Sequence, residues 1–116
     1  MGFENGITYK KSYKFAIRVV KLYKYLKYDK NEFVLSKQVL RSGTSIGALL
    51  REAKFAQSKA DFTHKLNIAL KEANETDYWI DLLYDTEFID KNMYQSIKKD
   101  IVELIKLLVS SVKSSK

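Results

Sequence analysis

The sequence predicts an all-α protein, an antiparallel up-down-up-down four-helix bundle, as one domain that spans residues 1–116. Four long segments repeat apolar residues at alternating spacings of three and four, which is the periodicity of an amphipathic helix. Proline is absent and glycine occurs only four times, so the chain lacks the turn residues that an all-β fold requires. The segments are joined by short connections, which favour antiparallel packing of consecutive helices.

The four predicted helices cover about residues 8–28, 32–57, 59–85 and 90–112. Each carries an apolar stripe wide enough to face the core of a bundle. The stripes are, in order, Phe15, Val19, Leu22 and Leu26; Leu35, Val39, Ser42, Ile46, Leu49 and Ala53; Phe62, Leu66, Ala69, Ala73, Thr76, Ile80 and Leu83; Ile97, Ile101, Leu104, Leu108 and Val112.

The segments outside the helices are short and polar. Residues 28–31 are predicted to form a loop, and residues 113–116 a frayed tail. Ser58 is followed three residues later by Asp61, a spacing that resembles a capping box and marks the start of the third helix.

Gly43 and Gly47 lie inside the second predicted helix, where each glycine costs about 1 kcal/mol relative to alanine. They are four residues apart and therefore share one face. We expect them to allow a second helix to approach closely. No Gly-Lys-Ser/Thr sequence follows, which argues against a phosphate-binding loop.

The composition offers no enzyme chemistry and no cofactor site. Cysteine is absent, which excludes disulfides, thiolate metal ligands and cysteine nucleophiles. His64 is the only histidine, and a di-iron bundle needs Glu-x-x-His pairs on two helices. The carboxylates of the third helix are better explained as a solvated or interface face than as an acid–base pair. They are Glu72, Glu75, Asp77, Asp81 and Asp85.

No apolar run approaches the roughly 20 residues of a membrane span. The first eleven residues also lack the apolar core of a signal peptide. We therefore expect a cytoplasmic protein that makes no membrane contact.

The net charge of +7 is concentrated at one end of the sequence. Residues 1–30 carry a net charge of +6 and residues 61–90 a net charge of −6. Five cations of the first helix fall in one sector of about 120°. A row of this kind could follow the phosphates of RNA or DNA, or it could be an ordinary solvated face. Four tyrosines of this helix could stack on unpaired bases, although tyrosines that flank a helix core more often pack; they are Tyr9, Tyr13, Tyr25 and Tyr28. The five cations are Lys10, Lys14, Arg18, Lys21 and Lys24.

A second set of apolar residues exceeds what one four-helix core needs. Such a surface often marks a subunit interface. We expect the basic first helix and the acidic third helix to meet across it. The predicted interface residues are Tyr13, Ile17 and Val20 on the first helix, and Tyr78, Trp79 and Leu82 on the third.

Two blocks of sequence resemble a known family. They are residues 38–53, which include QVLRSGTSIGA and REA, and residues 58–79, which include SKADF, ALKEA and ETDYW. The chain is similar over residues 12–108 to the four-helix bundle proteins encoded by intervening sequences of 23S ribosomal RNA genes. In many relatives the residue at position 49 is Asn, and here it is Leu49.

The resemblance implies an antiparallel four-helix bundle that assembles into a homopentameric ring. Accessory proteins of diversity-generating retroelements are similar in fold, and they are basic pentamers that bind nucleic acid and a reverse transcriptase. The family offers no catalytic residues to transfer. The sequence therefore favours a non-enzymatic homo-oligomer that binds RNA or DNA through its basic surface. The alternative is a protein-interaction scaffold that binds no nucleic acid.

Overall fold

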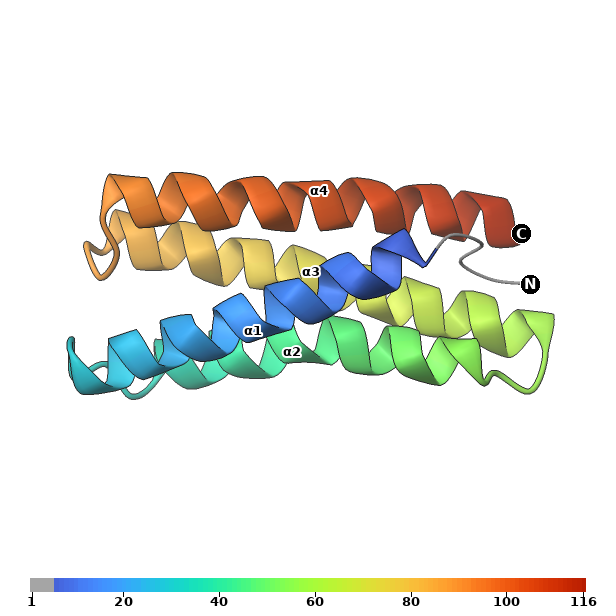
Figure 1. Ribbon diagram of the computed structural model, residues 1–116, viewed down its shortest axis with the longest axis horizontal. Coiled ribbons are helices and arrows are strands. Elements are labelled where there is room, and N and C mark those ends of the chain that lie inside the picture. Colours follow the sequence, from blue (N-terminus) through green and yellow to red (C-terminus); the bar gives the residue numbers. More distant parts are fainter. Residues whose placement is uncertain (1–5) are drawn as a thin grey trace.

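The chain folds into four long helices, and the computed structural model describes residues 6–116 (Figure 1). The first five residues, including Gly2, lie outside the described residues. The helices form a bundle of 43 × 21 × 19 Å in which consecutive helices run in opposite directions. This confirms the predicted four-helix bundle. The helices are α1 (Ile7–Tyr28), α2 (Leu35–Lys54), α3 (Lys59–Asp85) and α4 (Lys91–Ser115).

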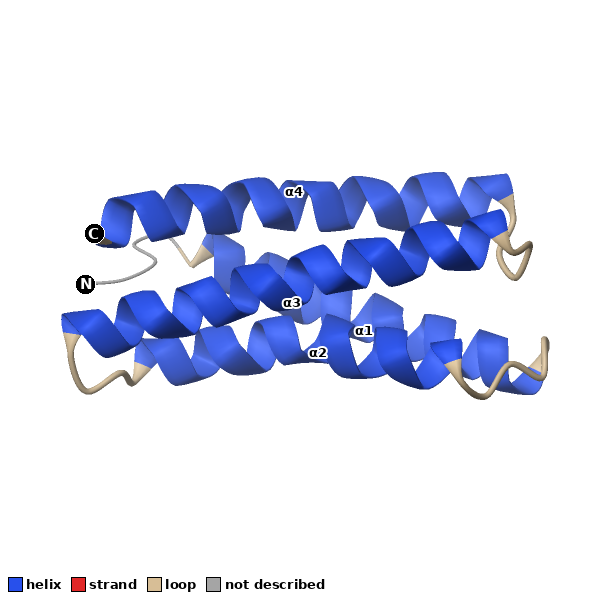
Figure 2. Cartoon of the chain, turned by 180° about the vertical axis from the view of Figure 1, so that it is seen from behind, coloured by secondary structure: helices blue, strands red, loops and turns tan. Residues whose placement is uncertain are grey.

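The four helices are arranged in a ring, with each helix between two neighbours (Figures 1 and 2). The pair α2 and α3 shares the longest contact, while α1 and α4 touch over a much shorter stretch. Helices α1 and α3 lie diagonally opposite each other and do not pack together. The bundle therefore has three well-packed seams and one weak one, between α1 and α4.

The predicted stripes form the core, with two exceptions in α2. Leu35 and Leu49 are half-buried, and Leu50 is fully buried at the position that the sequence assigned to Leu49. Leu49 and Leu50 both lie within about one turn of Ile46, so the periodicity alone does not show which of them is buried. The remaining residues of the four stripes are buried as predicted.

Gly43 allows the close contact between α2 and α1. A Cβ atom at this position would lie 2.7 Å from Cγ2 and 2.9 Å from Cγ1 of Val19. A Cβ atom at Gly47 would lie 3.5 Å from Oγ of Ser12, an ordinary van der Waals distance. The interpretation as a packing residue is confirmed for Gly43, whereas the packing around Gly47 leaves room for a Cβ atom and does not require glycine.

Helix α2 begins at Leu35, whereas the sequence pattern predicted that it begins near Glu32. Asn31 has a positive φ of 53° and turns the chain out of α1. The buried carboxylate of Glu32 then accepts hydrogen bonds from the backbone N–H groups of Val34, Leu35 and Ser36. Because these amides open α2, Glu32 caps the helix from outside instead of forming its first turn.

Two other helix ends are fixed by side chains. Oγ of Ser58 accepts a hydrogen bond from the N–H of Asp61 at 3.0 Å, as the predicted cap requires. Helix α4 extends to Ser115, so the prediction of a frayed tail after Val112 was wrong. The reason is that Ser115 is buried and its Oγ accepts a hydrogen bond from Oγ1 of Thr63 at 3.0 Å.

Candidate nucleic-acid interface

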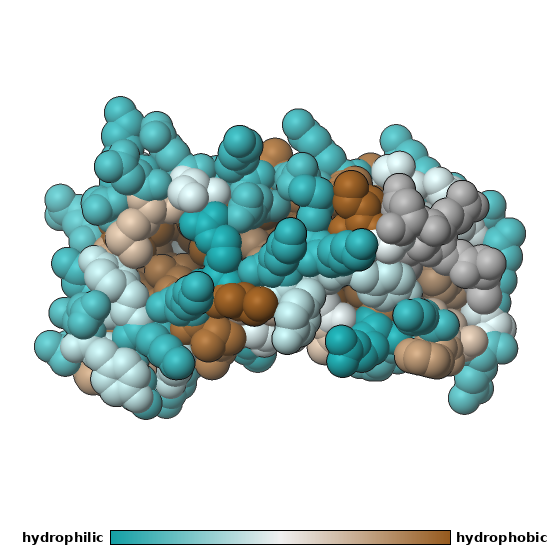
Figure 3. Space-filling view, in the orientation of Figure 1, coloured by the Kyte–Doolittle hydropathy of each residue, from teal (hydrophilic) through white to brown (hydrophobic). Residues whose placement is uncertain are grey.

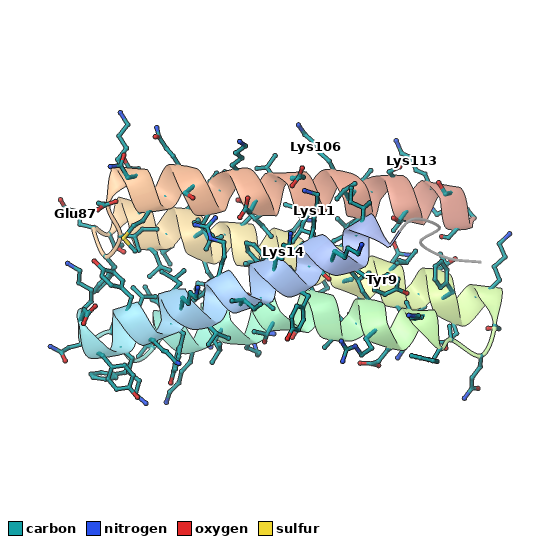
Figure 4. The ribbon with its side chains drawn as sticks, in the orientation of Figure 1. Tyr9, Lys11, Lys14, Glu87, Lys106 and Lys113 are labelled. Atoms are coloured by element: carbon teal, nitrogen blue, oxygen red, sulfur yellow. The ribbon has the colours of Figure 1, made fainter. Side chains whose placement is uncertain are left out.

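The outward face of α1 carries four exposed lysines. Lys10, Lys14, Lys21 and Lys24 have no ion-pair partner among residues 6–116. Figure 4 shows Lys14 on the side of α1 that faces the viewer, away from the core. Because the buried stripe of α1 faces α2 and the bundle axis, the opposite side of the helix is left to these cations.

Arg18, the fifth predicted cation, is engaged within the chain. Its guanidinium donates to Oδ2 of Asp100 at 2.6 Å and to Oγ of Ser96 at 2.9 Å. Lys11 forms a similar pair with Oε1 of Glu103 at 2.9 Å. Both bridges cross the weak α1–α4 seam, and exposed pairs of this kind each contribute roughly 0.2–1 kcal/mol. Arg18 therefore positions α1, and its charge is compensated by Asp100.

The predicted interface residues of α1 lie beside these lysines. Tyr13, Ile17 and Val20 are all exposed, and brown atoms gather over the middle of α1 in Figure 3. At 100° per residue, they occupy the α2 side of the outward face. The lysines occupy the α4 side, with Lys24 at the boundary. The outward face of α1 is thus divided lengthwise into an apolar half and a basic half.

On α3, only one of the three predicted interface residues is fully exposed. Tyr78 projects into solvent, while Trp79 and Leu82 are half-buried. The indole Nε1 of Trp79 donates to Oε2 of Glu75 at 2.9 Å, and its ring meets Tyr78 edge-on at 5.0 Å between centroids. Much of the Trp79 side chain thus packs against its own bundle.

Most carboxylates of α3 have cationic partners in the same chain. Lys98 of α4 contacts Asp77 at 2.7 Å and Asp81 at 3.0 Å. Arg41 of α2 pairs with Glu72 at 2.8 Å and also with Glu75. The sequence suggested that these acids meet α1 of another subunit, but four of the five are already paired with α2 or α4. The four carboxylates share two cations, so this face of α3 keeps a net negative charge, but its carboxylates are oriented toward α2 and α4 of the same chain.

The α3–α4 seam also shifts the pKa values of two residues. Burial lowers the pKa of Lys98, but hydrogen bonds to Asp77 and Asp81 outweigh it and raise this pKa above its usual range. The hydroxyl of Tyr94 donates to Oδ1 of Asp81 at 2.8 Å, which raises the pKa of Tyr94. At neutral pH, Lys98 is charged and Tyr94 is neutral, as the network requires.

A second basic row lies on α4 and was missed in the sequence. Its lysines recur at intervals of seven or eight residues, which places them along one line of the helix. All are exposed and none forms an ion pair within the described part of the chain. In Figure 4, Lys106 and Lys113 point away from the bundle. The seven-residue spacing was the available signal. The row comprises Lys91, Lys99, Lys106 and Lys113.

The side chains of residues 6–116 contain no cluster of three or more histidine, cysteine, aspartate or glutamate residues that could hold a metal ion. His64 is exposed on α3. No helix in that range is long and apolar enough to cross a membrane. The chemistry available on this surface is therefore that of exposed cations beside exposed apolar and aromatic groups.

The fold and its surface define a basic four-helix bundle with exposed rows of lysines on α1 and α4. Residues 4–110 match the model of the 23S rRNA-intervening sequence protein family. The chain belongs to this family, as the sequence blocks in α2 and α3 predicted.

A crystal structure from Bacteroides thetaiotaomicron is similar along nearly the whole chain. It shows a protein of unknown function from the S23 ribosomal protein family, 57% identical in sequence, with a TM-score of 0.93. The match covers 96% of this chain and 99% of that one. No functionally curated protein matches the sequence.

Proposed function

We propose that this protein is a non-enzymatic, cytoplasmic homo-oligomer that binds RNA or DNA through the outward face of α1. The observation that carries the proposal is the set of four exposed lysines on one helix face, none of which forms an ion pair with another residue of 6–116. Unpaired cations in a row can replace the counterions of a phosphate backbone. Lysines neutralise phosphates without reading base edges, so binding is insensitive to sequence.

The family name connects these proteins with 23S ribosomal RNA genes, which makes RNA the first ligand to test. One α1 face offers few phosphate contacts, so a single subunit binds weakly. A ring of subunits repeats the face, and the repeated contacts strengthen one another through effective concentration.

A ring is supported by the placement of the exposed apolar residues, and the family resemblance implies that it is a homopentamer. Ile17 and its neighbours lie on α1, whereas Tyr78 lies on α3, diagonally across the bundle. Two different patches on opposite sides can join head to tail, and such contacts form a ring when the rotation between successive subunits closes. In this arrangement the apolar half of α1 is covered by the next subunit, and the basic half remains at the edge of the contact.

The alternative function is a protein-interaction scaffold without nucleic-acid binding. It is favoured by the same exposed residues of α1, Tyr13, Ile17 and Val20, if a partner protein covers them instead of a second subunit. Salt separates the two functions, because phosphate binding weakens steeply as salt rises and apolar docking does not.

The proposal can be tested by fluorescence anisotropy of a labelled duplex DNA and a labelled structured RNA, each titrated with the protein at several salt concentrations. On a duplex of DNA, the log-log slope should be about −0.9 for each phosphate contacted. Lys14→Ala with Lys21→Ala should make that slope less negative by roughly 2 and weaken binding. Lys59→Ala with Lys71→Ala removes two exposed α3 lysines as a matched control and should change neither.

Two results would decide against nucleic-acid binding at α1. Absence of binding at low salt would leave the scaffold function, and an equal loss in both double variants would show that only net charge matters.

The head-to-tail ring predicts an unusual mixing result. Ile17→Asp places a charge in the apolar patch of α1, and Tyr78→Asp places one in the patch of α3. Each variant alone should therefore sediment as a monomer. Each variant retains the other patch intact. A mixture can therefore rebuild one interface but cannot extend it, and should sediment as a dimer. Wild-type mass for either variant alone, or monomers in the mixture, would show that the two patches do not meet.

A further inference from the structure

Exposed apolar side chains also gather at the turn between α1 and α2. Tyr28 is 68% exposed, Phe33 is 52% exposed and Val34 is 71% exposed. We call these three residues the α1–α2 tip. Large side chains that remain this exposed in adjoining positions often mark a binding surface.

The backbone of the tip is held in place on both sides. The N–H of Glu32 donates to the carbonyl of Leu26 at 2.9 Å, which fastens the turn to the end of α1. The carboxylate of Glu32 binds the first amides of α2, including the N–H of Val34 at 2.7 Å. Because the chain between α1 and α2 is fixed in this way, Phe33 and Val34 are presented to solvent by a preformed turn.

The surroundings of the tip are cationic. Lys24, Lys27, Lys30 and Lys37 lie in or beside the turn. The exposed acids near them are Asp29 in the turn, and Glu87 and Asp90, which line a surface pocket together with Lys30. The charge of Glu32 is buried and occupied by α2. Nζ of Lys27 lies 5.4 Å from the centroid of the Tyr28 ring. An anion that approaches the exposed rings therefore meets excess positive charge.

The tip also continues the basic half of α1. At 100° per residue, Tyr28 falls in the same sector as Lys14 and Lys21. The three residues are seven apart, so they follow one line of the helix at intervals of roughly 10 Å. A strand whose phosphates lie along the lysines therefore reaches the rings of Tyr28 and Phe33 at the end of α1.

We propose that the α1–α2 tip binds unpaired nucleotides by stacking their bases on Tyr28 and Phe33. This inference rests on the proposed function and specifies its ligand as single-stranded or looped nucleic acid. Bases inside a duplex cannot reach the rings, whereas unpaired bases stack on exposed aromatic side chains in single-strand-binding proteins. An anionic lipid surface would also suit apolar residues among lysines. The positions of Lys14 and Lys21 favour a strand, because these lysines continue the cationic surface along α1, away from the tip.

The test compares an oligothymidylate with a duplex of equal phosphate number. Tyr28→Ala with Phe33→Ala should weaken binding of the oligothymidylate by roughly tenfold or more and leave the duplex unchanged. Phe55→Ala is the matched control, because Phe55 is 76% exposed in the connection at the opposite end of the bundle (Figure 1). That variant should bind both ligands like the wild type.

A direct reporter of stacking is Phe33→Trp, read against the wild-type signal of Trp79, the only tryptophan. The added emission should be quenched by the oligothymidylate and unaffected by vesicles of phosphatidylcholine and phosphatidylserine. A blue-shifted, brighter emission with the vesicles and no quenching by the strand would overturn the inference in favour of a lipid surface.

The binding data also separate this inference from the proposed function. If the tip variant loses affinity equally for strand and duplex, or for neither, while the Lys14 and Lys21 variant still loses affinity, only the inference about unpaired bases fails. If the wild type binds neither ligand, the proposed function fails as well.

Discussion

Gly43→Ala is expected to destabilise the bundle by about 1 kcal/mol, even though alanine favours helix. The added Cβ would lie 2.7 Å from Cγ2 of Val19, a fully buried residue. A β-branched side chain in a packed core has no other rotamer to adopt, so α1 must move away from α2. Overpacking of this kind costs about 1–3 kcal/mol, and the gain in helix propensity offsets about 1 kcal/mol of it.

The matched control is Gly47→Ala, four residues further along the same face. Its Cβ has room beside Ser12, so the propensity gain should dominate and stability should rise by up to about 1 kcal/mol. Urea unfolding at one fixed protein concentration measures both changes, because assembly would make the midpoint depend on concentration. Equal shifts in the two variants would contradict the role assigned to Val19.

A second variant tests the contact itself. Val19→Ala alone should destabilise by leaving a cavity, but it also removes the two methyl groups that Gly43→Ala would strike. The double variant should therefore be more stable than the sum of the single changes predicts. Strict additivity would place the strain of Gly43→Ala elsewhere.

Glu32→Ala is expected to cost about 2 kcal/mol, the upper range for loss of a helix cap. The buried carboxylate accepts hydrogen bonds from the amides of Val34, Leu35 and Ser36, and alanine would leave these donors without an acceptor. Glu32→Gln keeps one carbonyl acceptor and should cost roughly half as much. The same unfolding measurement applies, and equal losses for the two variants would show that charge alone stabilises the cap.

Residues close together in the sequence proved the easiest to interpret. The stripes of α1, α3 and α4 could be read directly, since period and polarity change together along each helix. The beginning of α2 could not, because Glu32 has a good helical context and acts as a cap only after Asn31 has turned the chain. Leu49 and Leu50 could not be separated either, since the choice depends on how α2 is rotated against α3.

The candidate site was predictable as a helix face but not in its ion pairs. A helical wheel places Arg18 beside Lys14 and Lys21, yet it cannot show that Asp100 lies across the α1–α4 seam. The carboxylates of α3 were misjudged for the same reason, because Arg41 and Lys98 are distant in sequence. The buried end of α4 depended on Thr63, 52 residues before Ser115.

The weak seam between α1 and α4 gives the bundle an uneven resistance to opening. Stability in a folded chain is distributed locally, and an element with fewer contacts can open while the rest stays folded. Helix α1 packs closely against α2 on one side, whereas its contact with α4 on the other side is much smaller and includes the ion pairs of Arg18 and Lys11. The local opening with the lowest free-energy cost is therefore the separation of α1 from α4. The helix with the proposed binding face is thus also the helix with the weakest contact to one of its neighbours. A ligand that contacts both α1 and α4 would stabilise the closed seam and reduce local opening.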